Sequence, residues 1–338
     1  MGNVMKNIVI LATGGTIAGA GEQGKNIGYK SGSIEAQSLI DAIPELKTVA
    51  NIRVEQVCNI NSDDITSEIW ISLAKRIKEL SLSDDVDGVV VMHGTDTMEE
   101  TAFFLSLVLD VAKPVVLTGA MRPATAAEPD GPANLLFAVR SAAELCNNRV
   151  IYVAFAGKLM NAHTVQKIHA NDLDAFADIA GSSSACLPGH SAAGTFGLPS
   201  RSQPVLGPFD ISSLHTLPKV TVLYFNADAD AALIDFAAER SSGLVIAGAG
   251  AGEFSQAWAS AIADAIAKKN IPVVISSRIN RGSIVPEQLL VPGAIAAYDL
   301  PPAKAAVLLR LALTVTNDIT KIQDFFRSTS VILESEAR

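Results

Sequence analysis

Short apolar runs recur along the chain, and most of them end at glycine or threonine. They are rich in valine and isoleucine, and several are separated by segments with apolar residues at helical spacing. The runs are NIVILAT, DGVVVMHGT, KPVVLTGA, RVIYVAFAG, KVTVLYF, GLVIAGAG and IPVVISS. Strands that are apolar throughout and alternate with helices are typical of a parallel sheet covered on both faces. The sequence therefore predicts a doubly wound α/β fold.

The middle of the chain interrupts this alternation. Residues 181–219 are crowded with glycine, serine and proline, which indicates irregular strands or a hairpin followed by a linker. The chain has 338 residues, more than one domain usually holds. We therefore predict a larger N-terminal domain with a mainly parallel sheet over 1–210. A linker follows over 211–218, and a smaller C-terminal parallel α/β domain over 219–338.

Three helices are predicted in the first domain. One of them presents a single apolar face made of Ile65, Ile69, Leu73, Ile77 and Leu80. Another starts after Thr97, which forms a capping-box pattern with Glu100. A third is predicted from Asp130 as its cap, with Pro132 in the first turn.

Charge and hydropathy exclude several classes of partner. The formal net charge is −9 and no basic block is present, which argues against nucleic acid and anionic membrane surfaces. No apolar run reaches the length of a membrane span. The first residues enter a predicted strand without the features of a signal peptide. We expect a cytoplasmic protein, or a periplasmic one from which an export signal has been removed.

Four polar motifs follow predicted strands. They are Thr13-Gly-Gly-Thr16, His93-Gly-Thr95-Asp96, the segment 118–123 (TGAMRP) and the segment leading to Lys167. Three of them have a simpler interpretation. The first two motifs fit a turn or a helix cap, and Lys167 fits a solvated surface residue. Because ligands of open parallel sheets bind at the carboxyl ends of the strands, we expect these motifs to converge at one edge.

The residue types in these motifs suit hydrolytic acyl transfer. A threonine hydroxyl becomes a nucleophile when a base accepts its proton. Thr95, Asp96 and Lys167 supply a hydroxyl, an orienting carboxylate and a base. Backbone N–H groups in the turns at Gly15 and Gly94 are candidates to hold a developing oxyanion.

Other site types fit less well. The Gly-Gly turn lacks the Gly-Lys-Ser/Thr of a phosphate loop, and the G-x-G-x-x-G match at 19–24 is not followed by an apolar helix. His163 and His169 are too far apart in a helix to share a zinc ion. No G-x-S-x-G elbow is present.

The motifs TGGTIAG, HGTDTMEET, GAMRP followed by DGPANL, and AAVLLRLALT resemble those of the bacterial type II L-asparaginases and glutaminase-asparaginases. The resemblance implies that Thr16 is the nucleophile and that Tyr29, on a lid loop, assists proton transfer. Thr95, Asp96 and Lys167 then form a second triad that activates water. The implied substrate-binding positions are Gly15, Ser62, Asp63, Gly94, Ala120 and Glu287, and Asp96 also binds the α-amino group.

The resemblance also implies a homotetramer, a dimer of intimate dimers in which a partner's C-terminal domain completes the site. No cofactor or metal is implied. Two positions depart from the family pattern. A partner glutamate is expected where this chain has Leu289 or Leu290, so either Glu287 serves or the carboxylate is missing. Glu253 stands where relatives often carry asparagine or serine.

The expected function is that of an amidohydrolase that converts L-asparagine to L-aspartate and ammonia, with L-glutamine as a further substrate. Two alternatives stay open at this point. One is a member that prefers glutamine, and the other is an amino-acid-binding protein that has lost turnover.

Overall fold

The structure is a computed structural model and describes residues 5–25, 32–145, 149–179 and 209–330. The chain divides into two compact units. The first unit comprises 1–201 with 210–213, and the second comprises 202–209 with 214–338. Most of the segment 181–219, where irregular strands or a hairpin were predicted, lies outside the described residues, whereas the predicted linker 211–218 lies within them.

The first unit is built on a six-stranded sheet with the strand order β2-β1-β3-β4-β5-β6. The strands are β1 (Lys6–Gly14), β2 (Ala50–Ile60), β3 (Gly88–Met92), β4 (Val115–Thr118), β5 (Ile151–Phe155) and β6 (Lys158–Asn161). All neighbours are parallel except β6, which runs antiparallel to β5. The predicted mainly parallel sheet is confirmed.

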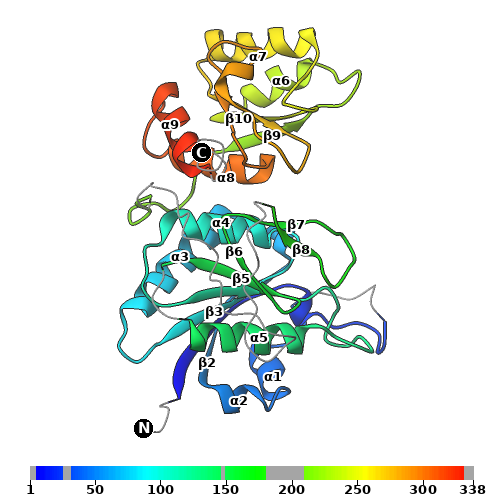
Figure 1. Ribbon diagram of the computed structural model, residues 1–338, viewed down its shortest axis with the longest axis vertical. Helices are drawn as coiled ribbons and strands as arrows, with labels where there is room; N and C mark the ends of the chain where they lie inside the picture. The colour runs from blue at the N-terminus through cyan, green and yellow to red at the C-terminus, as the bar shows by residue number, and fades with distance from the viewer. Residues whose placement is uncertain (1–4, 26–31, 146–148, 180–208, 331–338) are drawn as a thin grey trace, which may run out of the picture. The chain divides into compact units, whose positions relative to one another are not determined.

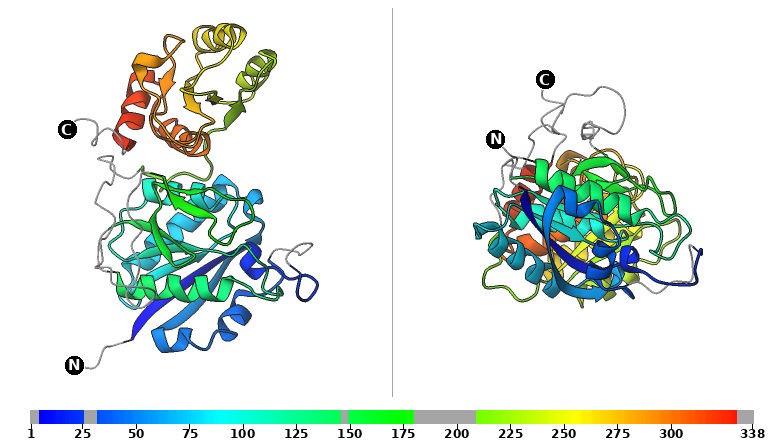
Figure 2. Two further views of the ribbon diagram at one scale, coloured as in Figure 1. Left: turned by 45° about the vertical axis from the view of Figure 1, so that its right-hand side comes forward. Right: turned by 90° about the horizontal axis from the view of Figure 1, so that it is seen from below.

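Helices cover both faces of this sheet. The helices α1 (Ala36–Asp41), α2 (Leu46–Val49) and α5 (Gly131–Glu144) share a core cluster with one face. The opposite face is covered by α3 (Ser67–Leu82) and α4 (Met98–Val108) (Figures 1 and 2). The doubly wound arrangement inferred from the alternating pattern is therefore confirmed. Ile65, placed on the apolar helical face by its spacing, lies before α3 begins.

Two predicted helix caps are wrong. Thr97 occupies the N-cap position of α4, but its hydroxyl does not cap the helix and donates instead to the Ser62 carbonyl at 2.7 Å. Asp130 occupies the N-cap position of α5, but its carboxylate accepts the backbone N–H groups of Met121 and Arg122 at 2.9 Å each. In both cases the capping group is used to hold a neighbouring loop. The predicted place of Pro132 in the first turn of α5 is confirmed.

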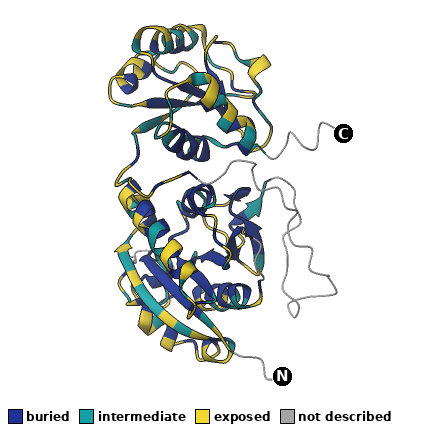
Figure 3. Ribbon diagram, turned by 90° about the vertical axis from the view of Figure 1, so that its left-hand side faces the viewer, coloured by how far each residue is buried: buried dark blue, intermediate teal, exposed yellow. Residues whose placement is uncertain are grey.

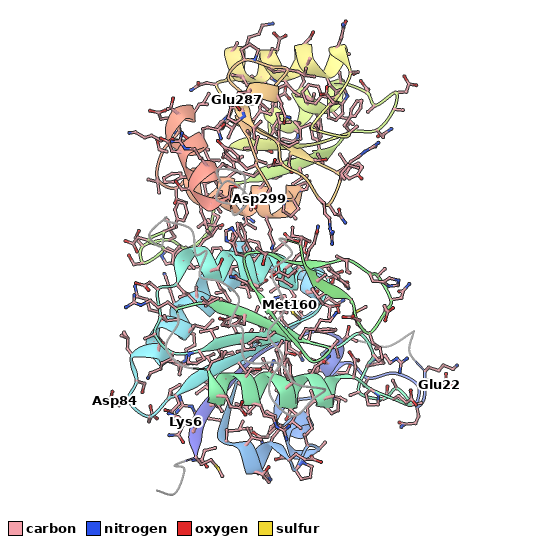
Figure 4. The ribbon with its side chains drawn as sticks, viewed as in Figure 1. Lys6, Glu22, Asp84, Met160, Glu287 and Asp299 are labelled. Atoms are coloured by element: carbon pink, nitrogen blue, oxygen red, sulfur yellow. The ribbon has the colours of Figure 1, made fainter. Side chains whose placement is uncertain are left out.

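A separate two-stranded ribbon follows β6. Strands β7 (Val165–Lys167) and β8 (Phe176–Asp178) pair antiparallel and are not hydrogen-bonded to the main sheet. Val165 and Phe176 are buried and anchor the ribbon by apolar packing. Met160 on β6 is also buried, in the interior of the first unit (Figure 4).

The second unit contains a four-stranded parallel sheet in the order β12-β11-β10-β9. Its strands are β9 (Val220–Tyr224), β10 (Gly243–Gly248), β11 (Val273–Ser277) and β12 (Ile295–Ala296). Its helices are α6 (Ala232–Ala238), α7 (Gln256–Lys269), α8 (Pro302–Ala312) and α9 (Ile319–Thr329). α6 and α7 share one core cluster with the sheet, and α8 contacts β9, β10 and β11. The predicted smaller parallel α/β domain is confirmed.

Burial follows this layered plan. The central strands of both sheets are buried, whereas β2, at the edge of the first sheet, mixes exposed and half-buried residues (Figure 3). No helix in the described parts of the chain is long and apolar enough to cross a bilayer.

Candidate active site

Three loops meet at the carboxyl ends of the adjacent strands β2, β1 and β3. Gly15 follows β1 with φ of +84°, and a Cβ atom there would lie 2.6 Å from both the Cα and the N of Gly94. A Cβ atom on Gly94 would lie 2.7 Å from the Ser62 Oγ. The backbones of the three loops are therefore in contact, and glycine is needed at both positions because any side chain would push the loops apart.

A cavity of about 580 Å³ opens where these loops meet. This volume lies within the range of small-molecule sites, roughly 300–1,000 Å³. The residues that line it are Gly15, Thr16, Asn59, Ile60, Asn61, Ser62, Asp63, Asp64, Gly94 and Asp96. Six of these are site residues predicted from the sequence. Of the four motifs expected to converge, those after β1 and β3 line this cavity, whereas residues 118–123 and Lys167 are not among its lining residues. The loop after β2, which was not among the four motifs, completes the lining.

Thr16 is half-buried at the start of a short 3₁₀ turn, η1 (Thr16–Ala18). The N–H of the preceding Gly15 donates to the Ile60 carbonyl at 3.0 Å, which ties the turn to the end of β2. The Gly15 N–H was one of the amides suggested as a donor to the oxyanion. Because it already donates to the Ile60 carbonyl, it is not available for that role.

Thr95, Asp96 and Lys167 form a hydrogen-bonded cluster. The Lys167 Nζ lies 2.9 Å from the Thr95 Oγ1 and 2.5 Å from the Asp96 Oδ1. The lysine side chain is only 14 % exposed, whereas that of Asp96 is 71 % exposed and borders the cavity. A charge-assisted contact of this length holds the ammonium end of a long side chain against a buried hydroxyl. The structure therefore brings Thr95, Asp96 and Lys167 into hydrogen-bonding contact. The sequence analysis predicted that these three residues act together.

The His93 side chain holds the Gly94–Thr95 peptide by a hydrogen bond to its carbonyl oxygen. The Trp70 indole N–H donates to the Thr101 Oγ1 at 2.8 Å, so the Thr101 hydroxyl hydrogen is available to the His93 Nε2, 3.0 Å away. The His93 Nδ1 then carries the proton and donates to the Gly94 carbonyl at 2.7 Å. Because a peptide unit is planar and trans, the Thr95 N–H points away from His93.

Burial lowers the pKa of His93 to about 4. Desolvation disfavours the charged imidazolium, and the accepted hydrogen bond at Nε2 also requires the neutral ring. The imidazole is therefore neutral near pH 7 and serves as a fixed donor to the turn that carries Thr95.

Ala120 is not among the residues that line the cavity. It is completely buried, and the core cluster that contains it also contains Ile17. Its loop is held by Asn134, whose amide donates to the Gly119 carbonyl at 3.0 Å and accepts the Ala156 N–H at 3.0 Å. Ala120 therefore presents no exposed surface to a ligand in this structure.

The remaining predicted positions lie elsewhere. Tyr29 lies outside the described residues. Glu287 lies in the second unit on the exposed turn η3 (Pro286–Gln288) (Figure 4), and Leu289 packs against the core of that unit. Glu253 is exposed in the second unit, where its carbonyl accepts the Ala249 N–H at 2.8 Å.

The cavity is also lined by Asn59, Asn61 and Asp64, which were not predicted from the sequence. Asn59 lies near the end of β2, and Asn61 and Asp64 follow that strand. The sequence of β2, ANIRVEQVCNI, alternates polar and apolar residues and so is not an apolar run. That alternation is the signal for a half-exposed strand and would have drawn attention to the loop after it. Three carboxylates, those of Asp63, Asp64 and Asp96, border the cavity and favour a ligand with a cationic group.

Comparison with known proteins covers nearly the whole chain. Residues 7–188 match the family model "Asparaginase, N-terminal", and residues 219–326 match "Glutaminase/Asparaginase C-terminal domain". "L-asparaginase 2" of Bacillus subtilis (strain 168) is 41 % identical over 95 % of this chain and 86 % of its own length. "Glutaminase-asparaginase" of Pseudomonas fluorescens biotype A is 36 % identical over 95 % and 90 %.

A solved structure is similar as well. It is the crystal structure of "Probable Cytoplasmic L-asparaginase" from Campylobacter jejuni, which is 38 % identical with a TM-score of 0.84. The match covers 95 % of this chain and 99 % of that one.

Proposed function

The chain belongs to the asparaginase family of amidohydrolases, and on that premise we propose that it hydrolyses L-asparagine to L-aspartate and ammonia. The observation that carries this proposal is the arrangement around one cavity: Thr16 on its wall, and Asp96 joining the same wall to Lys167 and Thr95. The acidic lining suits a substrate that carries an α-ammonium group.

The first step forms an acyl-enzyme. The Thr16 Oγ attacks the side-chain amide carbon of asparagine, its proton passes to the leaving nitrogen, and ammonia departs as the C–N bond breaks. The product of this step is an ester between Thr16 and the β-carboxyl group of aspartate. We propose that Tyr29 assists the proton transfer. The Thr95 N–H, which points away from His93, is the candidate donor to the oxyanion.

The second step hydrolyses the ester. We propose that Lys167, in its neutral amine form, accepts the proton of the Thr95 hydroxyl, which in turn draws a proton from the attacking water. Asp96 holds the Lys167 Nζ and binds the α-ammonium group of the substrate. Ser62 and Asp63 hold the α-carboxylate and α-amino groups. Water adds to the ester carbon, the bond to the Thr16 Oγ breaks as that oxygen takes up the proton released by the water, and aspartate leaves.

Glutamine is proposed as a second, poorer substrate. It is longer than asparagine by one methylene, and a pocket separates such substrates by only about 1–3 kcal/mol. We also propose that the working form is a homotetramer built as a dimer of intimate dimers. In that assembly the second unit of a partner subunit brings Glu287 to the substrate ammonium.

Ammonia release from asparagine and glutamine tests this function. The parent should release ammonia from asparagine, and Thr16→Ala and Lys167→Met should each lose several orders of magnitude in rate. Lys6→Met is the matched control, because Lys6 pairs with Asp87 at the amino end of β1, at the end of the sheet opposite the cavity. Mass spectrometry of a reaction quenched during turnover should find the ester on Thr16. An adduct on another residue, or a fully active Thr16→Ala variant, would refute the proposal.

A further inference from the structure

Lys167 is not held in place by the main sheet. It ends β7, in a ribbon that pairs only β7 with β8 among the described strands. Thr95 and Asp96, its partners, follow β3 in the middle of the six-stranded sheet. A two-stranded ribbon is marginally stable by itself. Something other than the strand ladder must therefore set the distance between the Lys167 backbone and its two partners.

Apolar packing of Val165 and Phe176 anchors the ribbon, and Glu99 connects the Lys167 backbone itself to the loop of its partners. Its Oε2 accepts the backbone N–H of Lys167 at 2.5 Å. Glu99 lies in the first turn of α4, which begins directly after the loop that carries Thr95 and Asp96. One carboxylate thus joins the backbone of the lysine to the helix that follows its partners. Hydrogen bonds from a backbone amide to a carboxylate are charge-assisted, and a carboxylate near a helix N-terminus is further stabilised by the dipole.

Both ends of Lys167 are then fixed. The backbone is held by Glu99, and the Nζ is held by Thr95 at 2.9 Å and by Asp96 at 2.5 Å. A lysine side chain has many rotamers, and its ammonium group keeps one position only when both ends are restrained. We infer that Glu99 is a positioning residue for Lys167: its carboxylate fixes the backbone of the lysine so that the Nζ reaches the Thr95 hydroxyl.

This inference rests on the proposed function and makes a kinetic prediction about one of its steps. In that mechanism Lys167 serves the hydrolysis of the ester, and Thr16 serves its formation. Loss of the Glu99 carboxylate should therefore slow the second step and spare the first. A displacement of about 1 Å in a catalytic group can cost about 100-fold in rate, so we expect kcat to fall by at least about 10-fold.

The experiment compares Glu99→Ala with Glu99→Gln. The alanine variant should show a kcat and a KM that fall together, with kcat/KM within about 2-fold of the parent. It should also release a burst of ammonia near one equivalent per site before a slower steady state, because the ester accumulates. Glutamine keeps an oxygen that can accept the Lys167 N–H, so Glu99→Gln should stay within about 3-fold of the parent.

Asp87→Ala is the matched control. Asp87 also accepts a backbone N–H from a distant segment, that of Asn7 at 2.8 Å, but it lies just before the amino end of β3, opposite the cavity. Its loss should leave kcat, KM and the burst unchanged. Should Glu99→Ala fail to fold, Glu99→Asp replaces it, because it keeps the charge and shortens the reach.

Three results would overturn the inference. They are a parent-like kcat in Glu99→Ala, an equal loss of kcat and kcat/KM with no burst, and a glutamine variant as slow as the alanine variant. A parent that releases no ammonia would instead refute the proposed function itself, so the two failures are distinguishable.

Discussion

Gly94→Ala tests the contact between the loops that build the cavity. The new methyl group would lie 2.8 Å from the Ser62 Cβ and 2.7 Å from its Oγ. Ordinary carbon contacts begin near 3.4 Å, so the Ser62 backbone would have to move by about 0.6 Å. Gly94 does not have a positive φ, so the alanine introduces steric overlap without backbone strain.

The size of the effect follows from that displacement. Overpacking of this kind costs about 1–3 kcal/mol of stability. Because Ser62 is proposed to hold the α-carboxylate of the substrate, a shift of about 0.6 Å should weaken binding. Scaled from about 100-fold for 1 Å, kcat/KM should fall by about 10-fold or more. Most of that loss should appear as a higher KM, because Ser62 binds and does not react.

Steady-state ammonia release over a range of asparagine concentrations measures both constants, and urea unfolding measures the loss of stability. Gly243→Ala is the matched control. Its methyl group would lie 2.9 Å from the Leu309 Cδ2, the end of a flexible side chain in the second unit. This control should lower stability without changing KM. If Gly94→Ala has the KM of the parent, Ser62 is not held against Gly94 in the working enzyme and the reasoning fails.

Four further results are expected. Thr97→Val, which removes the hydroxyl that donates to the Ser62 carbonyl at 2.7 Å, should raise KM several-fold, whereas Thr48→Val, which removes a bond of the same kind and length on the exposed surface, should not. Burial lowers the pKa of His93 to about 4, so between pH 6.5 and 4 the unfolded chain binds a proton that the native state excludes. The free energy of unfolding should therefore fall by roughly 3 kcal/mol as the pH is lowered through that window, and urea titrations should find this slope missing in His93→Gln. Asn134→Ala leaves the Gly119 carbonyl and the Ala156 N–H without the partner that each has now and should cost about 2–4 kcal/mol in the same assay. Glu287→Gln should raise KM for asparagine, and an unchanged KM would remove Glu287 from the site.

The arrangement of the first sheet was predictable because its central strands are buried on both faces. Runs such as VVVM in β3 and VVLT in β4 have no polar face, which is the pattern of a parallel strand between two helical layers. The edge strand β2 and the antiparallel β6 were not predicted. β2 is exposed on one side and alternates, and KLMN in β6 is too short to stand out from its surroundings.

The site was predictable where the topology alone brings residues together. Thr16 and Asp96 follow adjacent predicted strands, so a shared sheet edge was enough to place them around one cavity. Ser62 follows β2, which was not predicted, and it was identified by the resemblance alone. The position of Lys167 depends on a ribbon outside the sheet, and no periodicity in the sequence reports where that ribbon packs. Residue chemistry and the resemblance to the asparaginases both selected Lys167 without giving its place in the fold, and the comparisons confirm the family.

Thr97 and Asp130 show why local rules failed here. Threonine and aspartate are both favoured at the N-cap position, and capping stabilises an isolated helix. In the folded protein each side chain instead bonds a loop that is distant in the sequence, Ser62 in one case and Met121 with Arg122 in the other. Such long-range competition cannot be inferred from spacing.

The ribbon β7–β8 has a consequence for how this scaffold tolerates change. Insertions or deletions between its two strands would alter the setting of Lys167 without breaking a hydrogen bond of the six-stranded sheet. Side chains are not tolerated at Gly15 and Gly94, because the backbones of their two loops are in direct contact. In a randomised library screened for folding and not for activity, accepted variants should therefore concentrate in the ribbon turn, while the two glycine positions should return almost exclusively the parental residue.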